Sequence, residues 1–251
     1  MKRIDVLLVE KEFTKSRAQA QVYIKNGQVY IDGKNIDKSS IQVDESANIE
    51  IRGELQKYVS RGGYKLEEAI NKFNIDLKGK VCMDVGASTG GFTDCMLQNG
   101  ASKVYAIDVG HSQLDPKLAL DSRVVSIEKT NIKDVNKEKL ERIDFICIDV
   151  SFISLTNIME YIKNLTENSG EIVALIKPQF EVGRGNLNKK GIVKDEKTRK
   201  KTVDKIIEYM VKSNMFVKGV IESPIKGSDG NIEYLMYTIK EEGEDIGRKN
   251  G

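Results

Sequence analysis

The sequence predicts a doubly wound α/β domain with a small α+β module in front of it. After residue 80, near-continuous apolar stretches alternate with segments between them that can form helices, as in a parallel sheet covered by helices on both faces. The first 54 residues instead show two short helical patterns followed by short alternating stretches. A length of 251 residues also fits one to two domains at roughly 150 residues each.

The N-terminal module is predicted over residues 1–54. Ser16 precedes the second helical pattern and is a good N-cap residue. Asp32-Gly33 fits a tight turn between two short strands. The expected elements are helices at 4–8 and 18–24, strands within 27–34, and half-buried strands at 41–43 and 48–51.

The second domain is predicted over residues 65–240, after a linker at 55–64 that contains Arg61-Gly62-Gly63. The Gly-Ser-Asp-Gly-Asn loop at 227–231 favours an antiparallel hairpin of the last two strands at the sheet edge. We expect the charged tail, 241–251, to be disordered. The expected strands are 80–85, 103–108, 123–127, 143–149, 171–176, 216–222 and 233–240, and the expected helices are 65–73, 92–99, 113–120, 134–140, 154–166 and 196–213.

Composition excludes several classes of protein. The net charge of +2 is too small for a polycation, so a nucleic-acid surface must come from local clustering. No run of 18 apolar residues exists, and no secretory signal is recognisable, so we expect a cytoplasmic protein. Three cysteines without metal-ligand spacing and one histidine, His111, argue against a metal site and a Ser-His-Asp triad.

The stretch from Val81 to Phe92 is a buried strand that runs into a glycine-rich turn and then a helix. The spacing Gly-x-x-x-Gly-Gly is not that of a dinucleotide site or a phosphate loop. Asp84 would repel a pyrophosphate but could bind an ammonium group. Asp108 ends the second strand 22 residues after Gly86, where ribose hydroxyls would lie.

A ligand with a ribose, an amino-acid ammonium and no phosphate is S-adenosylmethionine. The alternative is that the glycines only form a tight strand-to-helix turn. Asn131 could meet the adenine edge or simply cap a helix. The candidate cofactor-binding residues are Asp84, Gly86, Ala87, Ser88, Gly90, Gly91, Phe92, Asp108, Asn131 and Asp149.

With these motifs the chain resembles the TlyA family of ribosomal RNA 2′-O-methyltransferases, whose members are also called hemolysins. The N-terminal part, from Arg3-Ile4-Asp5 to Gly33-Lys34, resembles the S4-type RNA-binding module, and the remainder resembles FtsJ-type methyltransferases. The resemblance implies a Rossmann-like class I fold with the last strand antiparallel. It also implies S-adenosyl-L-methionine as cofactor, ribosomal RNA in a ribosomal subunit as partner, and methyl transfer to a cytidine ribose 2′-hydroxyl.

The resemblance further implies a catalytic tetrad of Lys65, Asp149, Lys177 and Glu233, with Glu222 as the alternative to Glu233. Independently of it, Asp149 and Lys177 each end a predicted parallel strand, where ligands bind in such sheets. A lysine near a sulfonium can have a lowered pKa and accept the hydroxyl proton. The alternative is a set of surface ion pairs. The family linker often carries a tryptophan, which this chain lacks; Tyr58 lies in that neighbourhood.

Basic clustering supports an RNA partner. Residues 177–205 hold ten Lys or Arg and four acidic residues, and we expect 183–191 to be a mobile loop. The alternative is an ordinary solvated helix face. The candidate RNA-binding residues are Arg3, Lys11, Ser16, Arg17, Lys25, Lys34, Arg61, Arg184, Lys189 and Lys190.

Other functions fit less well. A cytosine C5 enzyme needs a nucleophilic cysteine, and Cys147 lies within a predicted buried strand. Phe152 could stack a flipped base, but we expect it in the core. A membrane-active cytolysin and a non-catalytic RNA-binding protein remain the alternative functions. No amphipathic basic stretch favours the first, and the complete set of glycines and tetrad candidates argues against the second.

Overall fold

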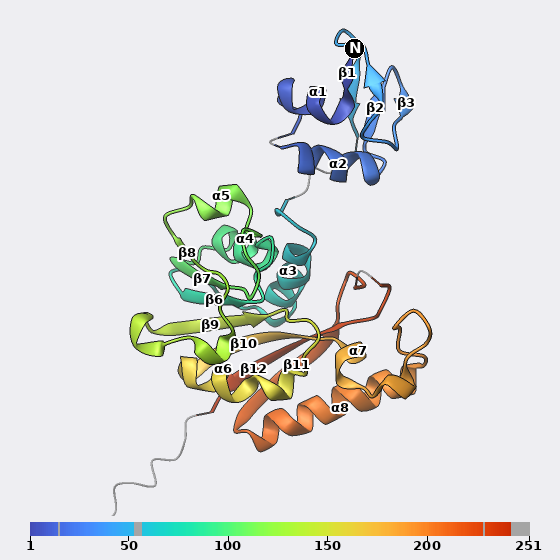
Figure 1. Ribbon diagram of the computed structural model, residues 1–251. Helices are drawn as coiled ribbons and strands as arrows, with labels where there is room; N and C mark the ends of the chain where they lie inside the picture. The colour runs from blue at the N-terminus through green and yellow to red at the C-terminus, as the bar shows by residue number, and fades with distance from the viewer. Residues whose placement is uncertain (15, 53–56, 228, 242–251) are drawn as a thin grey trace, which may run out of the picture. The chain divides into compact units, whose positions relative to one another are not determined.

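The computed structural model describes residues 1–14, 16–52, 57–227 and 229–241 (Figure 1). The chain forms two compact units, Met1–Lys57 and Tyr58–Gly251, and each is described by itself. Residues 53–54 of the predicted module and 242–251 of the predicted tail lie outside the described residues.

The first unit contains the two helices and short strands expected from the sequence. Ser16 caps the second helix by accepting a hydrogen bond from the backbone N–H of Gln19 at 3.2 Å. β2 pairs with β3 and β5, and β1 pairs with β4. The elements are β1 (Lys2–Arg3), α1 (Ile4–Glu10), α2 (Arg17–Lys25), β2 (Val29–Ile31), β3 (Lys34–Asn35), β4 (Gln42–Val43) and β5 (Ile49–Ile51).

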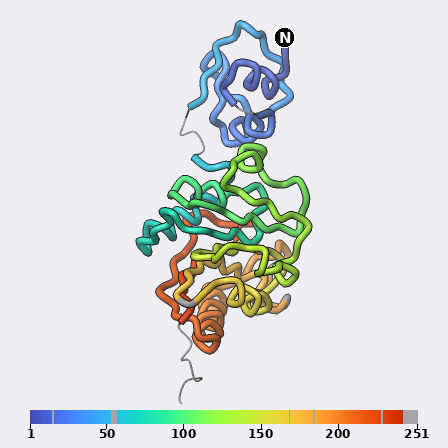
Figure 2. The backbone as a smooth tube through the Cα atoms, turned by 90° about the vertical axis from the view of Figure 1, so that its left-hand side faces the viewer, coloured from blue at the N-terminus to red at the C-terminus, as the bar shows by residue number. Residues whose placement is uncertain are grey.

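The second unit is built on a seven-stranded sheet of order β11-β12-β10-β9-β6-β7-β8. β12 runs antiparallel to both of its neighbours, whereas the pairs from β10 to β8 are parallel. Figures 1 and 2 show the red β12 among segments from the middle of the chain. The doubly wound fold and the antiparallel hairpin at the edge are therefore confirmed. The strands are β6 (Val81–Val85), β7 (Lys103–Ile107), β8 (Val124–Ile127), β9 (Ile143–Ile148), β10 (Thr166–Ile176), β11 (Met215–Glu222) and β12 (Tyr234–Lys240).

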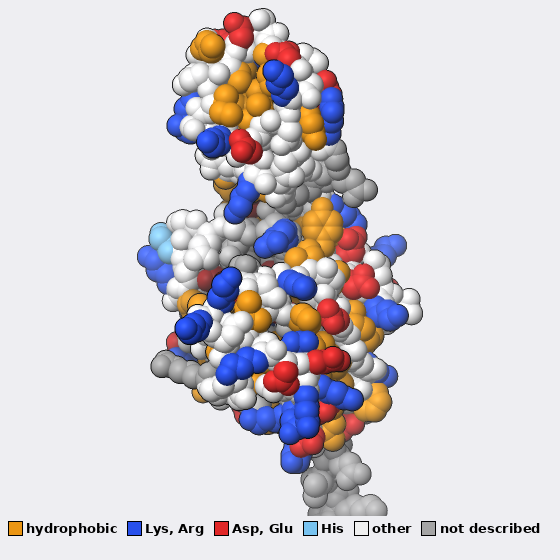
Figure 3. Space-filling model, turned by 90° about the vertical axis from the view of Figure 1, so that its right-hand side faces the viewer, with side chains coloured by type: hydrophobic (Ala, Val, Ile, Leu, Met, Phe, Trp, Pro, Cys, Tyr) orange, Lys and Arg blue, Asp and Glu red, His pale blue; other side chains and the backbone are white. Residues whose placement is uncertain are grey.

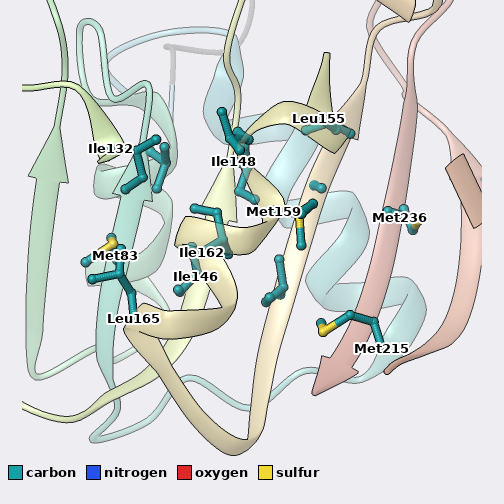
Figure 4. Packing of buried hydrophobic residues seen from close by; sticks show 14 of the residues in the cluster. Met83, Ile132, Ile146, Ile148, Leu155, Met159, Ile162, Leu165, Met215 and Met236 are labelled. Carbon is teal, nitrogen blue, oxygen red and sulfur yellow. The ribbon is translucent and has the colours of Figure 1, made fainter. Parts of the chain in front are cut away.

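The sheet buries apolar side chains on both faces. Along β9, Phe145 and Cys147 join one apolar cluster, whereas Ile146 and Ile148 join the other. Helices α3 (Gly62–Phe73) and α4 (Gly91–Gln98) supply the first cluster, and α6 (Met159–Leu165) and α8 (Glu196–Lys212) supply the second. Figure 4 shows the second cluster from close by. Cys147 is fully buried, which fits inert packing.

Several predicted helices are shorter or absent. Only Pro116–Ala119 of the expected helix 113–120 is helical (α5), because a residue before proline is restricted to extended backbone. The expected helix 134–140 is wrong. Two 3₁₀ turns, η1 (Ile132–Asp134) and η2 (Lys137–Lys139), replace it, since Asn131 and Asn136 each bond to the backbone two residues on.

The expected helix 154–166 is also divided. Ser154 accepts a hydrogen bond from the N–H of Thr156 and begins a 3₁₀ turn, η3 (Leu155–Asn157), before α6. Thr166 then opens β10, whose pairing with β9 is irregular between Thr166 and Glu171. The remaining helical turns near the site are α7 (Pro178–Glu181) and η4 (Arg184–Asn186).

The segment interpreted as a linker contributes to the second unit. Tyr58 is 1% exposed and belongs to the apolar cluster with Leu66 and Phe92. α3 begins at Gly62 rather than at Lys65, because the small Gly63 packs directly against the Tyr58 ring, where a Cβ atom would collide. The second unit therefore begins at Tyr58, whose ring packs in its core, and not after the Arg-Gly-Gly run.

Candidate active site and RNA-binding surfaces

The glycine-rich turn joins β6 to α4 at the carboxyl edge of the parallel strands. Gly86 and Gly90 have φ of +88° and +91°, which favours glycine. A Cβ atom on Gly86 would collide with the carbonyl oxygen of Asp149, and one on Gly90 would collide with Leu118. Both glycines are therefore needed for the turn and for its packing, which supports the tight-turn interpretation alongside the cofactor interpretation.

Two carboxylates hold this turn. Asp84 is buried, and its Oδ2 accepts hydrogen bonds from N–H and Oγ1 of Thr93 at 2.9 and 2.7 Å. Burial, together with the nearby charge of Asp149, raises the pKa of Asp84 to about 7, although the hydrogen bonds from Thr93 act in the opposite direction. Asp108 accepts a hydrogen bond from the N–H of Ser88 at 2.7 Å, so its carboxylate also supports the turn.

A cavity of about 360 Å³ opens beside the turn. Its volume lies within the range of small-molecule sites. Seven of the candidate cofactor residues, Asp149 among them, line it together with Lys65 and seven residues that the sequence did not single out for the cofactor. The lining residues are Ser60, Arg61, Gly62, Lys65, Asp84, Gly86, Ala87, Ser88, Thr89, Gly91, Phe92, Asp149, Ile225, Lys226 and Gly227.

Lys177 and Asp149 form an ion pair at the ends of two adjacent strands. Nζ of Lys177 lies 2.6 Å from Oδ1 of Asp149 and donates to Oγ of Ser151 at 2.9 Å. The side chains are 12% and 23% exposed, so the pair is largely shielded from water. β9 and β10 are parallel neighbours, and the chain therefore brings the two residues to one edge of the sheet.

Lys65 and Glu233 form a second ion pair. Nζ of Lys65, on α3, lies 2.6 Å from Oε2 of Glu233, which directly precedes β12. Glu233 is 3% exposed, and Nε2 of Gln179 donates to its Oε1 at 3.5 Å. Glu222, the alternative in the sequence, is exposed at the end of β11. The structure thus brings Glu233, and not Glu222, to Lys65.

Four candidates lie differently from the expectation. Asp108 holds the N–H of Ser88 but does not itself line the cavity. The side chain of Asn131 caps η1 and does not line the cavity, which is the helix-cap alternative. Gly90 packs on Leu118 instead of lining the cavity. Phe152 is not in the core: it is 90% exposed with φ of +65°, and its ring lies 4.9 Å from that of Phe180. An exposed turn directly after Asp149-Val150-Ser151 explains the error, since strand periodicity ends there.

The first unit carries a cluster of charged groups around one buried carboxylate. Asp5 is 0% exposed, and it accepts hydrogen bonds from Arg3, Arg17 and Gln21 at 2.9–3.1 Å. The hydrogen bond from Arg3, together with those from Arg17 and Gln21, holds the pKa of Asp5 well below its usual range despite burial. Sequence reasoning named both arginines but missed Asp5 as their common partner. The sequence offered one indication of this role, since Asp5 is an acidic residue between Arg3 and Arg17.

The other RNA-binding candidates are dispersed over both units. Ser16 caps α2, so its hydroxyl has a structural role. The side chain of Arg184 lies outside the described part of the structure. The expected mobile loop is instead an ordered hairpin in part, with Leu187 bridged to Val193. The exposed candidates are Lys11, Lys25, Lys34, Arg61, Lys189 and Lys190.

Comparison with known proteins decides the family. The model of the FtsJ-like methyltransferase family matches residues 58–240, and that of the S4 domain matches residues 2–49. The chain belongs to the FtsJ-like methyltransferase family. This confirms the methyltransferase fold, with an S4 domain at the N-terminus, and members of this fold class depend on S-adenosylmethionine.

Relatives match nearly the whole chain. The 16S/23S rRNA (cytidine-2′-O)-methyltransferase TlyA of Mycobacterium tuberculosis is 37% identical over 94% of this chain and 88% of its own. Hemolysin A of Brachyspira hyodysenteriae is 45% identical over 94% and 99%. A solved structure described as a candidate hemolysin from Streptococcus thermophilus is 40% identical with a TM-score of 0.77 and covers 96% of this chain and 89% of that one. The resemblance to the TlyA family is thereby confirmed.

Two structural features are absent from the described part of the chain. Within residues 1–14, 16–52, 57–227 and 229–241, no helix has the length and apolar character needed to cross a membrane. No group of three or more His, Cys, Asp or Glu side chains in that part of the chain could hold a metal ion.

Proposed function

We propose that this FtsJ-like enzyme uses S-adenosylmethionine to methylate a ribose 2′-hydroxyl of ribosomal RNA, at a cytidine. The observation that carries the proposal is the Lys177–Asp149 ion pair at the edge of the sheet, because Asp149 also lines the cavity beside the glycine-rich turn. The reaction and substrate named for the TlyA relatives support the same conclusion.

The residues around the cavity fit S-adenosylmethionine. This cofactor supplies a methyl group on a sulfonium cation. Asp84 and Asp149 place two carboxylates on the cavity, which suits a cationic amino acid, and backbone N–H groups of the turn suit its carboxylate. Asp108 does not line the cavity, but its carboxylate accepts from the N–H of Ser88, which does, and we therefore place the ribose hydroxyls on this side of the turn. A group with phosphates would instead be repelled by Asp84.

Lys177 is the proposed proton acceptor. Its Nζ is fixed by Asp149 and Ser151, so it keeps one position at the strand end. As the oxygen of the 2′-hydroxyl forms its bond to the methyl carbon and the sulfur–carbon bond breaks, the hydroxyl proton would pass to Nζ of Lys177. Asp149 would stabilise the ammonium that results.

Lys65 and Glu233 are proposed to hold the nucleotide that is methylated. Lys65 lines the cavity, and Glu233 fixes its ammonium. Holding the ribose within reach of Lys177 is a positioning role, and misplacement by 1 Å at such sites costs on the order of 10²-fold in rate. The exposed ring of Phe152, which follows Ser151, offers a face on which a base can stack.

The first unit is proposed to anchor ribosomal RNA. Arg3 and Arg17 are about half exposed and keep guanidinium N–H groups that Asp5 does not use. Phosphate contacts of this kind supply affinity without reading sequence. We therefore assign RNA binding to residues 1–54, catalysis to 65–240, and a place in the cytoplasm where ribosomes are found.

The test is methyl transfer by the purified protein to ribosomal RNA, followed by mapping of ribose-methylated nucleosides. Calorimetry with S-adenosylmethionine is carried out in parallel. Ribosomal RNA from cells with and without the gene should differ at a ribose-methylated cytidine. Cofactor binding without transfer would indicate the non-catalytic RNA-binding protein. Absence of both, with lysis of erythrocytes, would indicate the cytolysin.

A further inference from the structure

The segment that follows Lys177 contains a hairpin and a helix, with an excess of lysines that have no carboxylate partner among the described residues. Residues 189–201 hold seven basic and two acidic residues. Figure 3, seen from the side of α7 and α8, shows many Lys and Arg side chains over the second unit. We define the hairpin–α8 surface as Lys189, Lys190, Lys194, Lys197, Lys200 and Lys201, all of which are exposed.

None of these six lysines forms an ion pair with a carboxylate of the described residues. Elsewhere in the second unit, exposed and half-buried lysines do find partners: Lys117 pairs with Asp94, and Lys137 pairs with Glu167. The carboxylate of Asp195, which lies within the cluster, is taken by N–H and Oγ1 of Thr198 as the helix cap. The positive charge of the surface is therefore not neutralised locally.

The position of the lysines on α8 is unfavourable for the helix itself. Lys197 lies in its first turn, where the positive end of the helix dipole repels cations, and Lys200 and Lys201 follow in the second turn. The apolar face of the same helix, with Val203, is buried against the sheet and is not available to a lipid surface. The helix dipole therefore gives these lysines no stabilisation, and an external anion supplies a reason for their position.

The hairpin is fixed to the wall of the cavity. Asn188 accepts hydrogen bonds from the N–H groups of Lys190 and Ile192 at 2.8 and 3.0 Å, which closes the turn. The buried side chain of Asn231 accepts from the N–H of Val193 at 3.1 Å and donates to the carbonyl of Gly191 at 3.1 Å.

Asn231 in turn connects to the cavity lining. Its carbonyl accepts a hydrogen bond from the N–H of Gly227 at 2.9 Å, and Lys226 and Gly227 line the cavity. The lysines at the hairpin are thus held in a fixed relation to the site where the ribose would bind. A polyanion that crosses the hairpin can continue toward the cavity past the exposed Lys226.

We infer that the hairpin–α8 surface is a second RNA-binding surface, which contacts the phosphate backbone next to the methylated nucleotide. This inference rests on the proposed function and adds to it an RNA contact within the methyltransferase unit itself. Six ammonium groups without carboxylate partners suit closely spaced phosphates. Lysines act as point charges and read no bases, so the surface supplies affinity and orientation.

The test uses the full chain and two triple variants that remove equal charge. The first is Lys197→Ala/Lys200→Ala/Lys201→Ala. The matched control is Lys72→Ala/Lys139→Ala/Lys212→Ala, which removes exposed lysines elsewhere, one of them from the last turn of α8. Binding to transcribed 16S and 23S ribosomal RNA is measured against salt concentration, together with kcat and KM for RNA and the Kd for S-adenosylmethionine.

For the first variant we expect the slope of log K against log salt to fall by about 2–3, because each lost phosphate contact removes about 0.7–0.9. KM for RNA should rise roughly 10–100-fold, whereas kcat and the cofactor Kd should stay within about twofold. The control should stay near the parent protein in all four quantities. Equal effects of the two variants would overturn the inference, as would no effect of either.

Two further results are distinguishable from these. If the parent protein binds no cofactor and transfers no methyl group, the proposed function fails, whatever the slopes show. Vesicles that contain phosphatidylserine serve as a second probe at 150 mM salt. Vesicle binding that the first variant loses, with RNA binding unchanged, would assign the surface to a membrane and overturn the RNA assignment.

Discussion

Nζ of Lys65 lies 2.6 Å from Oε2 of Glu233, although 168 positions separate the two residues in the chain. The pair joins α3, the first helix of the second unit, to the residue that precedes its last strand. Both side chains are nearly buried, so each is the counterion that makes burial of the other tolerable.

Glu233→Gln should therefore impair both stability and activity. The amide keeps the shape but leaves the Lys65 ammonium without its counterion, and breaking a buried pair costs about 3–5 kcal/mol. Methyl transfer should fall by about 10²-fold through misplacement of Lys65. Urea unfolding and single-turnover kinetics measure the two effects. Glu222→Gln, at an exposed site, is the control and should change neither. A strong effect of the control alone would assign the role to Glu222.

Lys177→Ala should lower methyl transfer by roughly 10²–10⁴-fold, the usual worth of a positioned acid–base group. Cofactor affinity, measured by calorimetry, should change little, because Lys177 is not among the residues that line the cavity. Lys177→Arg should not rescue turnover, since a guanidinium stays protonated. Near-normal turnover in the arginine variant would show that Lys177 is only a fixed positive charge. Asp149→Asn should be severely impaired as well, because its amide cannot stabilise the protonated lysine.

Gly86→Ala should abolish cofactor binding by displacing the neighbouring strand end. The new Cβ atom would meet the carbonyl oxygen of Asp149, which is backbone and cannot move aside. Gly79→Ala is the matched control, because Gly79 also has a positive φ, of +74°, but has open space around its missing Cβ. The control should lose only about 1–2 kcal/mol of stability from backbone strain. Normal cofactor affinity in a folded Gly86→Ala protein would contradict the assignment of the glycine-rich turn to cofactor binding.

Cofactor affinity should depend on pH through Asp84. Because burial raises the pKa of Asp84 to about 7, the free protein carries a proton there below that pH. A cationic ligand favours the carboxylate, so binding releases the proton. The affinity should then rise by up to about tenfold per pH unit between pH 5.5 and 7 and level off above.

Calorimetry in buffers of different ionisation enthalpy counts the released proton. Asp84→Asn is expected to bind more weakly and to release none. Without ligand, the raised pKa has the opposite sign for folding: stability should fall as pH rises from about 4 to 7, by at most roughly 1.4 kcal/mol per unit. A cofactor affinity that is flat over this range would contradict the assignment of Asp84.

Asp5→Asn should loosen the first unit and weaken RNA binding together. Asp5 is the common acceptor for Arg3, Arg17 and Gln21, and its loss as a charge should cost about 3 kcal/mol. Its pKa is lowered in the folded state, so this stabilisation is present above about pH 4 and is lost as pH falls. Hydrogen exchange of peptides from residues 1–52 measures it. Asp44→Asn, at an exposed site of the same unit, should leave both properties unchanged.

The sequence was most informative where strands end. Asp149 and Lys177 could be placed together because parallel strands present their carboxyl ends at one edge, whatever the loops do. The apolar runs of β6, β7 and β9 were likewise visible without a structure. Helices were less predictable where local bonds compete: Asn131 and Asn136 bond to the backbone two residues on and leave only 3₁₀ turns.

Loop residues of the site could not be predicted. Ser60, Lys226 and Gly227 line the cavity only because α3 and the β11–β12 connection fold back over the glycine-rich turn. The hydrophobic periodicity of the sequence does not show which loops come close to each other in the fold. The choice between Glu222 and Glu233 depended on the same connection. The prediction of Phe152 in the core was wrong for a related reason. The alternation of a strand does not predict where side chains point after the last paired residue of that strand.

The antiparallel strand inserted between β10 and β11 also sets the order in which the enzyme becomes competent. β12 follows the other strands of the described residues, yet it pairs with two of them and brings Glu233 to Lys65. During synthesis, β11 leaves the ribosome before the strand with which it pairs, and Lys65 leaves before Glu233. On the proposed roles of Lys65 and Glu233, methyl transfer becomes possible only after this hairpin has emerged and closed.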